Sequence, residues 1–192
     1  MYTDEILDSE IENNEIEKYL SSGSQTQITP EIEKITSEIS GTVLEKTQKI
    51  LEIGPTLVER KDFDERVFRK RSGAQIIQDK YITGCTDAAL VFIVLARASG
   101  IPTKYIETID VEWLKKGGSS IGGHVYAQVY DEAQDKWVWV DPMRRNVGNS
   151  PGEDRVIFDE GLDSWDLGIT DYNSLRSEFE IFRKQWKSKP SA

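Results

Sequence analysis

The sequence is poor in the residues that build disulfides and soft metal sites, with one cysteine and one histidine among 192 residues. A single cysteine cannot form an internal disulfide, and one Cys with one His leaves a zinc shell to carboxylates without metal-ligand spacing. No apolar run reaches about 18 residues without a charge, and the acidic start MYTDEILDSE is unlike a signal peptide. We therefore expect a cytoplasmic protein whose thiol stays reduced, with no metal and no cofactor.

Positive charge is also scarce, because 24 Lys and Arg residues face 34 Asp and Glu residues, for a net charge of -10. Binding to nucleic acid or to an anionic membrane requires clustered Lys and Arg, so neither partner is expected. One basic patch lies in residues 59–73 among four acids, and we interpret it as a solvated face, with an acidic substrate or partner as the alternative. Residues 159–166 carry four carboxylates, but their spacing does not match an EF-hand loop, which argues against a calcium site.

The length predicts one globular domain. Residues 1–25 form an acidic segment that is either a frayed tail or a docking helix, residues 26–186 form the domain, and residues 187–192 form a frayed tail. Within the domain, helices are expected at residues 30–39, from residue 43 up to Gly54 and Pro55, and at residues 175–186.

The only cysteine lies at the start of an apolar stretch that predicts a buried helix over about residues 85–99. Thr83 is a plausible N-cap, and Gly100 and Pro102 end the helix. The unpaired N–H groups at a helix start favour a thiolate, which makes Cys85 a candidate nucleophile. The alternative is that Cys85 is a small buried apolar side chain.

The only histidine, His124, begins an alternating segment typical of a strand, and a second strand ends at Asp141. If Tyr130 pairs with Trp137 across the turn, Asp141 lies opposite Tyr126 and diagonal to His124 on the same face. That separation lets an imidazole meet a carboxylate, whereas a slip of one residue would put them on opposite faces. A cysteine nucleophile needs a base oriented by a third group, and these residues provide both.

At these residues the sequence resembles the transglutaminase-like (papain-like) superfamily. The resemblance covers about residues 26–149 and rests on the segments GCTDAA, LARASGIPTKYIE, GGHVYAQVY and WVWVDP. It implies an α+β papain-like fold, in which a central Cys-bearing helix packs on an antiparallel β-sheet. It also implies that Cys85 is the nucleophile, His124 the general base and acid, and Asp141 the orienting carboxylate.

Other parts of the site are less defined. No motif identifies the side chain that assists the oxyanion hole, and the candidates are Gln75, Gln78 and Tyr81. The segment VEWLKKGGSSIGG before His124 is expected to be a glycine-rich loop, either a mobile lid or an ordinary connection. Trp113 in this loop is either a substrate wall or an anchor.

The function that we expect is cysteine-dependent acyl transfer at an amide or peptide carbonyl through a thioester. Hydrolysis, as in a protease or amidase, is favoured over crosslinking by analogy with other small domains. The expected partner is a peptide or protein substrate. The alternatives are a catalytically silent binding or scaffold domain and a redox sensor at Cys85.

Overall fold

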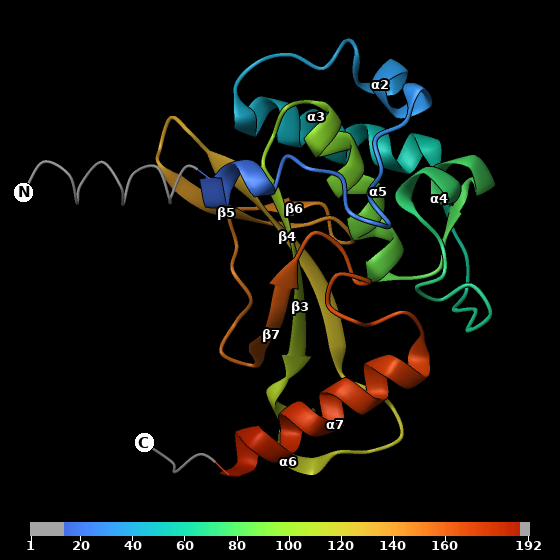
Figure 1. Cartoon of the computed structure of the whole chain (residues 1–192), viewed down its shortest axis with the longest axis vertical. Coiled ribbons are helices and arrows are strands. Elements are labelled where there is room, and N and C mark those ends of the chain that lie inside the picture. Colours follow the sequence, from blue (N-terminus) through green and yellow to red (C-terminus); the bar gives the residue numbers. More distant parts are fainter. Residues whose placement is uncertain (1–13, 189–192) are drawn as a thin grey trace, which may run out of the picture.

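The computed structural model describes residues 14–188, in which helices pack at both ends of a five-stranded antiparallel sheet (Figure 1). The strand order is β6-β5-β4-β3-β7. The strands are β3 (Thr103–Asp110), β4 (Gly123–Asp131), β5 (Lys136–Asp141), β6 (Asn146–Val147) and β7 (Arg155–Gly161). This arrangement confirms the α+β papain-like fold predicted from the sequence.

The central helix α5 (Cys85–Ala98) is buried from Ala89 to Arg97. Its composition explains this position, because a helix that is apolar nearly all round must be enclosed by other elements. Gly100 follows the helix with a φ of 76°, the left-handed conformation that favours glycine. The N-cap, however, is Gly84 without a side-chain hydrogen bond, so the prediction of Thr83 as N-cap was wrong.

Three helices pack against α5, namely α2 (Pro30–Thr36), α3 (Val43–Leu57) and α4 (Gly73–Asp79). The caps explain where they start: Thr29 caps α2 with Pro30 at the first position, and Thr42 and Glu45 form a capping box on α3. α3 passes through Gly54 and Pro55 and is longer than the predicted helix. A parallel two-stranded ribbon of β1 (Glu59–Arg60) and β2 (Tyr81–Ile82) completes this side.

The register between β4 and β5 is the one predicted from the sequence, since Tyr130 pairs with Trp137 and Ala127 with Val140. Val125, Ala127 and Val129 are fully buried in the cluster that includes α5. A slip by one residue would expose this row, which explains why the hydrophobic pattern specifies the register.

A second buried cluster lies at the other end of the sheet, where α6 (Val111–Lys116) and α7 (Tyr172–Ser188) meet it (Figure 1). α6 occupies part of the segment that was expected to be loop. Asp110 accounts for the helix, because its side chain accepts a hydrogen bond from the N–H of Glu112 as an N-cap.

The N-terminal segment is only partly described. Residues 14–18 are helical, Tyr19 is buried edge-on against Trp137, and the side chain of Gln25 is fully buried. Residues 1–13 and 189–192 lie outside the described residues. The division of the chain after residues 25 and 186 remains a prediction. No helix within residues 14–188 is long and apolar enough to cross a membrane.

Candidate active site

Three elements bring the candidate residues together. Cys85 is the first residue of α5, His124 is the second residue of β4, and Asp141 is the last residue of β5. Nε2 of His124 lies 2.9 Å from Oδ2 of Asp141, and the two residues are 8% and 4% exposed. Cys85 is half-buried and is therefore more exposed than His124 and Asp141.

His124 is the most strongly perturbed of these residues. Burial lowers the pKa of His124, but hydrogen bonds with Asp141 and Cys85 outweigh it and raise the pKa to about 9. Because Nε2 is bonded to Asp141, the ring nitrogen that remains for Cys85 is Nδ1. The imidazole is thus bonded to a carboxylate, and the thiol of Cys85 contributes to its raised pKa.

Asp141 is fixed by two donors. Its Oδ2 bonds to His124, and its Oδ1 accepts a hydrogen bond of 3.0 Å from the backbone N–H of Arg144. Burial raises the pKa of Asp141, but these hydrogen bonds prevail and hold it below its ordinary value. The Arg144 guanidinium lies 3.6 Å from Oδ2 and forms an ion pair with the same carboxylate.

Aromatic rings fix the orientation of the imidazole. The ring of His124 meets that of Tyr126 at a centroid distance of 4.8 Å and an angle of 88°, and Tyr126 in turn meets Trp139 at 5.8 Å. Edge-to-face contacts of this kind favour one ring position. The imidazole is therefore restricted by packing as well as by its hydrogen bond to Asp141.

The turn before Cys85 is held by Asp87. Its Oδ2 accepts hydrogen bonds from the N–H of Thr83 at 2.8 Å and from the Thr83 hydroxyl at 2.9 Å, and pairs with Arg71 at 2.7 Å. Arg71 also pairs with Asp79 at 3.0 Å. Thr83 therefore stabilises the start of α5 through its hydrogen bonds to Asp87, and it is not the N-cap of the helix.

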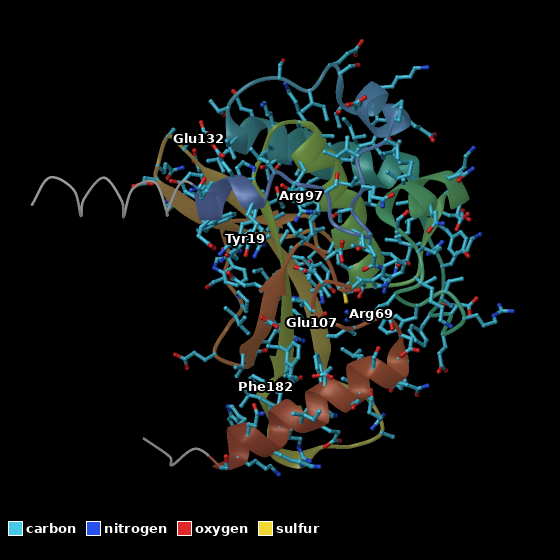
Figure 2. The ribbon with its side chains drawn as sticks, viewed as in Figure 1. Tyr19, Arg69, Arg97, Glu107, Glu132 and Phe182 are labelled. Carbon is cyan, nitrogen blue, oxygen red and sulfur yellow. The ribbon has the colours of Figure 1, made fainter. Side chains whose placement is uncertain are left out.

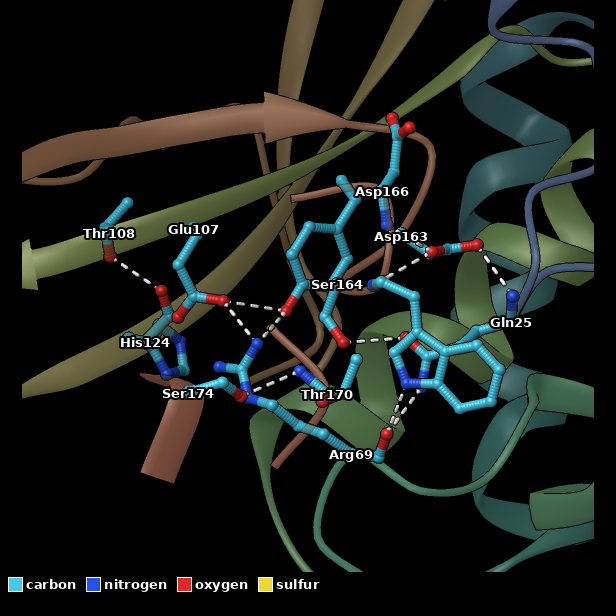
Figure 3. A network of polar contacts seen from close by, with 12 residues as sticks. Gln25, Arg69, Glu107, Thr108, His124, Asp163, Ser164, Asp166, Thr170 and Ser174 are labelled. Atoms are coloured by element: carbon cyan, nitrogen blue, oxygen red, sulfur yellow. Dashed lines mark hydrogen bonds and ion pairs between the residues drawn. The ribbon is translucent and has the colours of Figure 1, made fainter. Parts of the chain in front are cut away.

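A second buried ion pair joins Arg69 to Glu107 of β3 at 2.8 Å, and Tyr105 lies within hydrogen-bond distance of both (Figures 2 and 3). Arg69 and Arg71 are 2% and 7% exposed. The interpretation of residues 59–73 as a solvated face was therefore wrong for these two residues. The sequence contained one indication of this ion pair. Glu107 lies on the same face of the predicted strand as Tyr105 and Ile109, and a carboxylate on such an apolar face needs a partner.

The oxyanion candidates lie at several places in the fold. Gln75 is exposed, and its side chain closes the capping box of α4 on Ser72. Gln78 is exposed on the same helix, and Tyr81 in β2 packs under the guanidinium of Arg71 at 4.3 Å. None of the three has a contact with Cys85 among the described interactions.

Trp113 and the loop after it belong to the second cluster. Trp113 is 5% exposed and packs against Phe179 at a centroid distance of 6.0 Å, the arrangement expected of an anchor. The glycine-rich loop is bonded to α7, because Arg176 and Tyr172 both donate to the carbonyl of Ser119. This end of the loop has a fixed attachment.

No group of three or more His, Cys, Asp or Glu side chains that could hold a metal ion occurs within residues 14–188. The buried carboxylate of Asp163 has a structural use, since it accepts hydrogen bonds from the N–H groups of Gln25, Trp165 and Asp166. These bonds fix the N-terminal segment to the turn after β7.

Comparisons with known proteins agree with this architecture. The family model of the transglutaminase-like superfamily matches residues 33–142, a range that contains the three candidate residues. No curated protein sequence matches the chain.

One of the similar solved structures shows the same fold. A "putative cysteine protease" from Cytophaga hutchinsonii superposes with a TM-score of 0.63 at 20% identity, over 81% of this chain and 50% of that protein. The chain therefore spans about half the length of that protein. LapG from Legionella pneumophila matches 84% of this chain and 99% of its own, with a TM-score of 0.49 and 13% identity.

Proposed function

Because the chain belongs to the transglutaminase-like superfamily, we propose that it is a cysteine-dependent acyltransferase that hydrolyses an amide or peptide bond. Cys85 is the nucleophile, His124 the general base and acid, and Asp141 the group that orients His124. The substrate is a peptide or a protein. The proposed compartment is the reducing cytoplasm, where a reactive thiol persists.

The observation that supports this proposal is the hydrogen bond between His124 and Asp141, beside a thiol that contributes to the raised pKa of His124. Asp141 accepts from Nε2 at 2.9 Å, which leaves Nδ1 for the thiol. With a pKa of about 9, the imidazole carries a proton at neutral pH. That proton stabilises a thiolate before attack and is available to a leaving amine afterwards.

The first half of the reaction forms a thioester. The sulfur of Cys85 attacks the carbonyl carbon, and the π electrons of the carbonyl move to its oxygen. The first N–H groups of α5 have no side-chain cap and are available to that oxyanion. As the tetrahedral intermediate collapses, the C–N bond breaks and the amine takes the proton from His124.

The second half releases the acyl group. Neutral His124 takes a proton from a water molecule, the oxygen attacks the thioester carbon, and the C–S bond breaks to return the thiolate and a carboxylic acid. An amine in place of water would give a crosslink by the same steps. We favour water by analogy with other small domains of this fold.

The test is alkylation of the protein by iodoacetamide from pH 4 to 10. Cys85 is the only cysteine in the sequence, so every alkylated molecule reports this thiol. We expect fast alkylation well below pH 8.5, the ordinary pKa of a free thiol being about 8.5, and slower alkylation in His124→Ala. A slow reaction that is indifferent to His124 contradicts the proposal and points to a binding domain.

A further inference from the structure

An apolar pocket of about 320 Å³ lies beside the candidate active site. It is enclosed by α3, α5, the β1–β2 ribbon and the loop that follows β5. Its lining is mostly apolar, and comprises Ile50, Leu51, Gly54, Pro55, Val58, Ile82, Ala88, Val91, Phe92, Leu95, Pro142 and Met143, with Glu59, Arg60 and Arg145.

The floor of the pocket continues the face of α5 that begins at Cys85. Ala88, Phe92 and Leu95 follow Cys85 at intervals of three, four and three residues, which places all four along one side of the helix. Ala88 is one turn from Cys85, a rise of about 4.5 Å along the axis. An amide bond at Cys85 therefore has this pocket within one or two residues of its carbonyl.

A second wall of the pocket is formed by the residues that directly follow Asp141. Pro142 and Met143, which line the pocket, are the two residues after Asp141. The pocket is thus joined through the chain both to the proposed nucleophile and to the carboxylate behind His124. This continuity separates it from an incidental surface hollow.

The chemistry of the pocket fits one kind of occupant. Apolar walls with a few polar groups at the rim are the usual form of a site for an apolar group. A cavity of about 150 Å³ holds a benzene ring, so the volume is sufficient for a leucine or phenylalanine side chain. Arg60 and Arg145 are exposed at the rim without an ion pair among residues 14–188, and their guanidinium groups can donate to main-chain carbonyls of a bound peptide.

We propose that this pocket is a specificity site that takes an apolar side chain of the substrate one or two residues from the scissile carbonyl. The inference rests on the proposed function, because it names the kind of peptide on which Cys85 acts. Burying a whole apolar side chain favours the matching peptide by about tenfold or more.

The test uses three chloromethyl ketones: acetyl-Gly-Gly, acetyl-Leu-Gly and acetyl-Gly-Leu. The thiolate attacks the carbon that carries chlorine, the C–S bond forms, and chloride leaves with the electron pair. We expect at least one leucine reagent to alkylate Cys85 about tenfold faster than the acetyl-Gly-Gly reagent, in second-order rate constant. Equal rates for all three overturn the inference.

Gly54 offers a variant that fills the pocket without touching the proposed catalytic residues. A Cβ added at Gly54 meets nothing within 4 Å, and the residue is helical, so Gly54→Leu projects into open space. Thr56→Leu is the matched control, because Thr56 is exposed, lies about 200° around the helix and is not a lining residue. We expect Gly54→Leu to remove the leucine preference and Thr56→Leu to keep it.

Alkylation by iodoacetamide distinguishes a failure of the pocket inference from a failure of the proposed function. It has no side chain to place, so its rate should be the same in the parent and in Gly54→Leu. If iodoacetamide alkylation depends on His124 but the leucine preference is absent or survives in Gly54→Leu, the pocket inference fails alone. If iodoacetamide is slow and indifferent to His124, the proposed function fails and the pocket inference with it. Gly54→Ala, which adds only a methyl group and favours the helix, provides a second variant with a smaller expected effect.

Discussion

Oδ2 of Asp141 accepts a hydrogen bond from Nε2 of His124 at 2.9 Å, while Oδ1 of the same carboxylate is bonded to the N–H of Arg144. The second bond prevents the carboxylate from rotating away from the imidazole. Asp141 thus favours the neutral tautomer in which Nε2 carries the hydrogen, which leaves Nδ1 for Cys85.

The first prediction concerns Asp141→Asn. The amide keeps the shape of the carboxylate but removes its charge and can present an N–H to His124, which disfavours the required tautomer. We expect the rate of peptide hydrolysis to fall by roughly 10²- to 10⁴-fold, with the protein still folded. The measurement is turnover of a mixed peptide library by mass spectrometry, with far-UV circular dichroism as the check on folding. A variant with the turnover of the parent contradicts the role given to Asp141.

The second prediction concerns Cys85→Ser. The two side chains are nearly the same size, and Cys85 is only half-buried, so the substitution should shift the thermal midpoint little. A hydroxyl is far less acidic than a thiol and is a poor nucleophile here, so peptide hydrolysis should be abolished. Retained turnover in Cys85→Ser would refute the assignment of the nucleophile.

The third prediction concerns stability at alkaline pH. The pKa of His124 is about 9 in the folded protein, above the value of about 6.5 expected when unfolded, so protonation of His124 stabilises the fold. This contribution is fully present below about pH 6.5 and is lost as pH rises through about 9. We expect the thermal midpoint to fall between pH 7 and 10.

The control for this prediction is His124→Gln, which cannot titrate. Its midpoint should change less than that of the parent over the same interval. At acid pH the sign is opposite for Asp141, whose lowered pKa gives a stabilisation that is present above about pH 4 and is lost as pH falls through the folded value. Parallel alkaline profiles in parent and variant would contradict the role of His124.

The fourth prediction concerns the buried pair of Arg69 and Glu107, whose side chains are 2% and 1% exposed. Removing one partner leaves an uncompensated charge in the interior, so Arg69→Met and Glu107→Leu should each lose about 3–5 kcal/mol of unfolding free energy. The double variant leaves no isolated charge and should recover much of that loss. Urea unfolding of the four proteins measures the coupling, and additive losses would show that the pair has no coupling energy.

Much of this site was predictable because it depends on local patterns. The alternation of Val125, Ala127 and Val129 specified the face of β4, and the short turn specified the register that places Asp141 beside His124. The buried arginines were not predictable in the same way. A mixed charge run is usually solvated, and only the paired carboxylates of Glu107 and Asp87, distant in sequence or in another element, account for the burial of Arg69 and Arg71. Ion pairs between residues of different elements leave no periodic pattern in the sequence from which they could be predicted.

The last prediction tests Asp87 as a positioning residue for Cys85. Its Oδ2 holds both the N–H and the hydroxyl of Thr83, two residues before Cys85, and is paired with Arg71. Asp87→Asn removes the charge that all three donors share, so the turn at the start of α5 should loosen. We expect a loss of about 3 kcal/mol and a decrease in the His124-dependent part of the iodoacetamide rate at pH 6 to 7.

Asp79→Asn is the matched control, because Asp79 is the other partner of Arg71, with a side chain that is 42% exposed and makes no hydrogen bond to Thr83. An ion pair with a largely exposed carboxylate contributes little, so this variant should lose less than about 1 kcal/mol and keep the alkylation rate of the parent. If the two variants lose the same stability and alkylate at the same rate, Asp87 only neutralises Arg71. If Asp87→Asn alone slows the reaction, the carboxylate acts on the thiol through the Thr83 turn, since the loss of the pair with Arg71 is matched by the Asp79→Asn control.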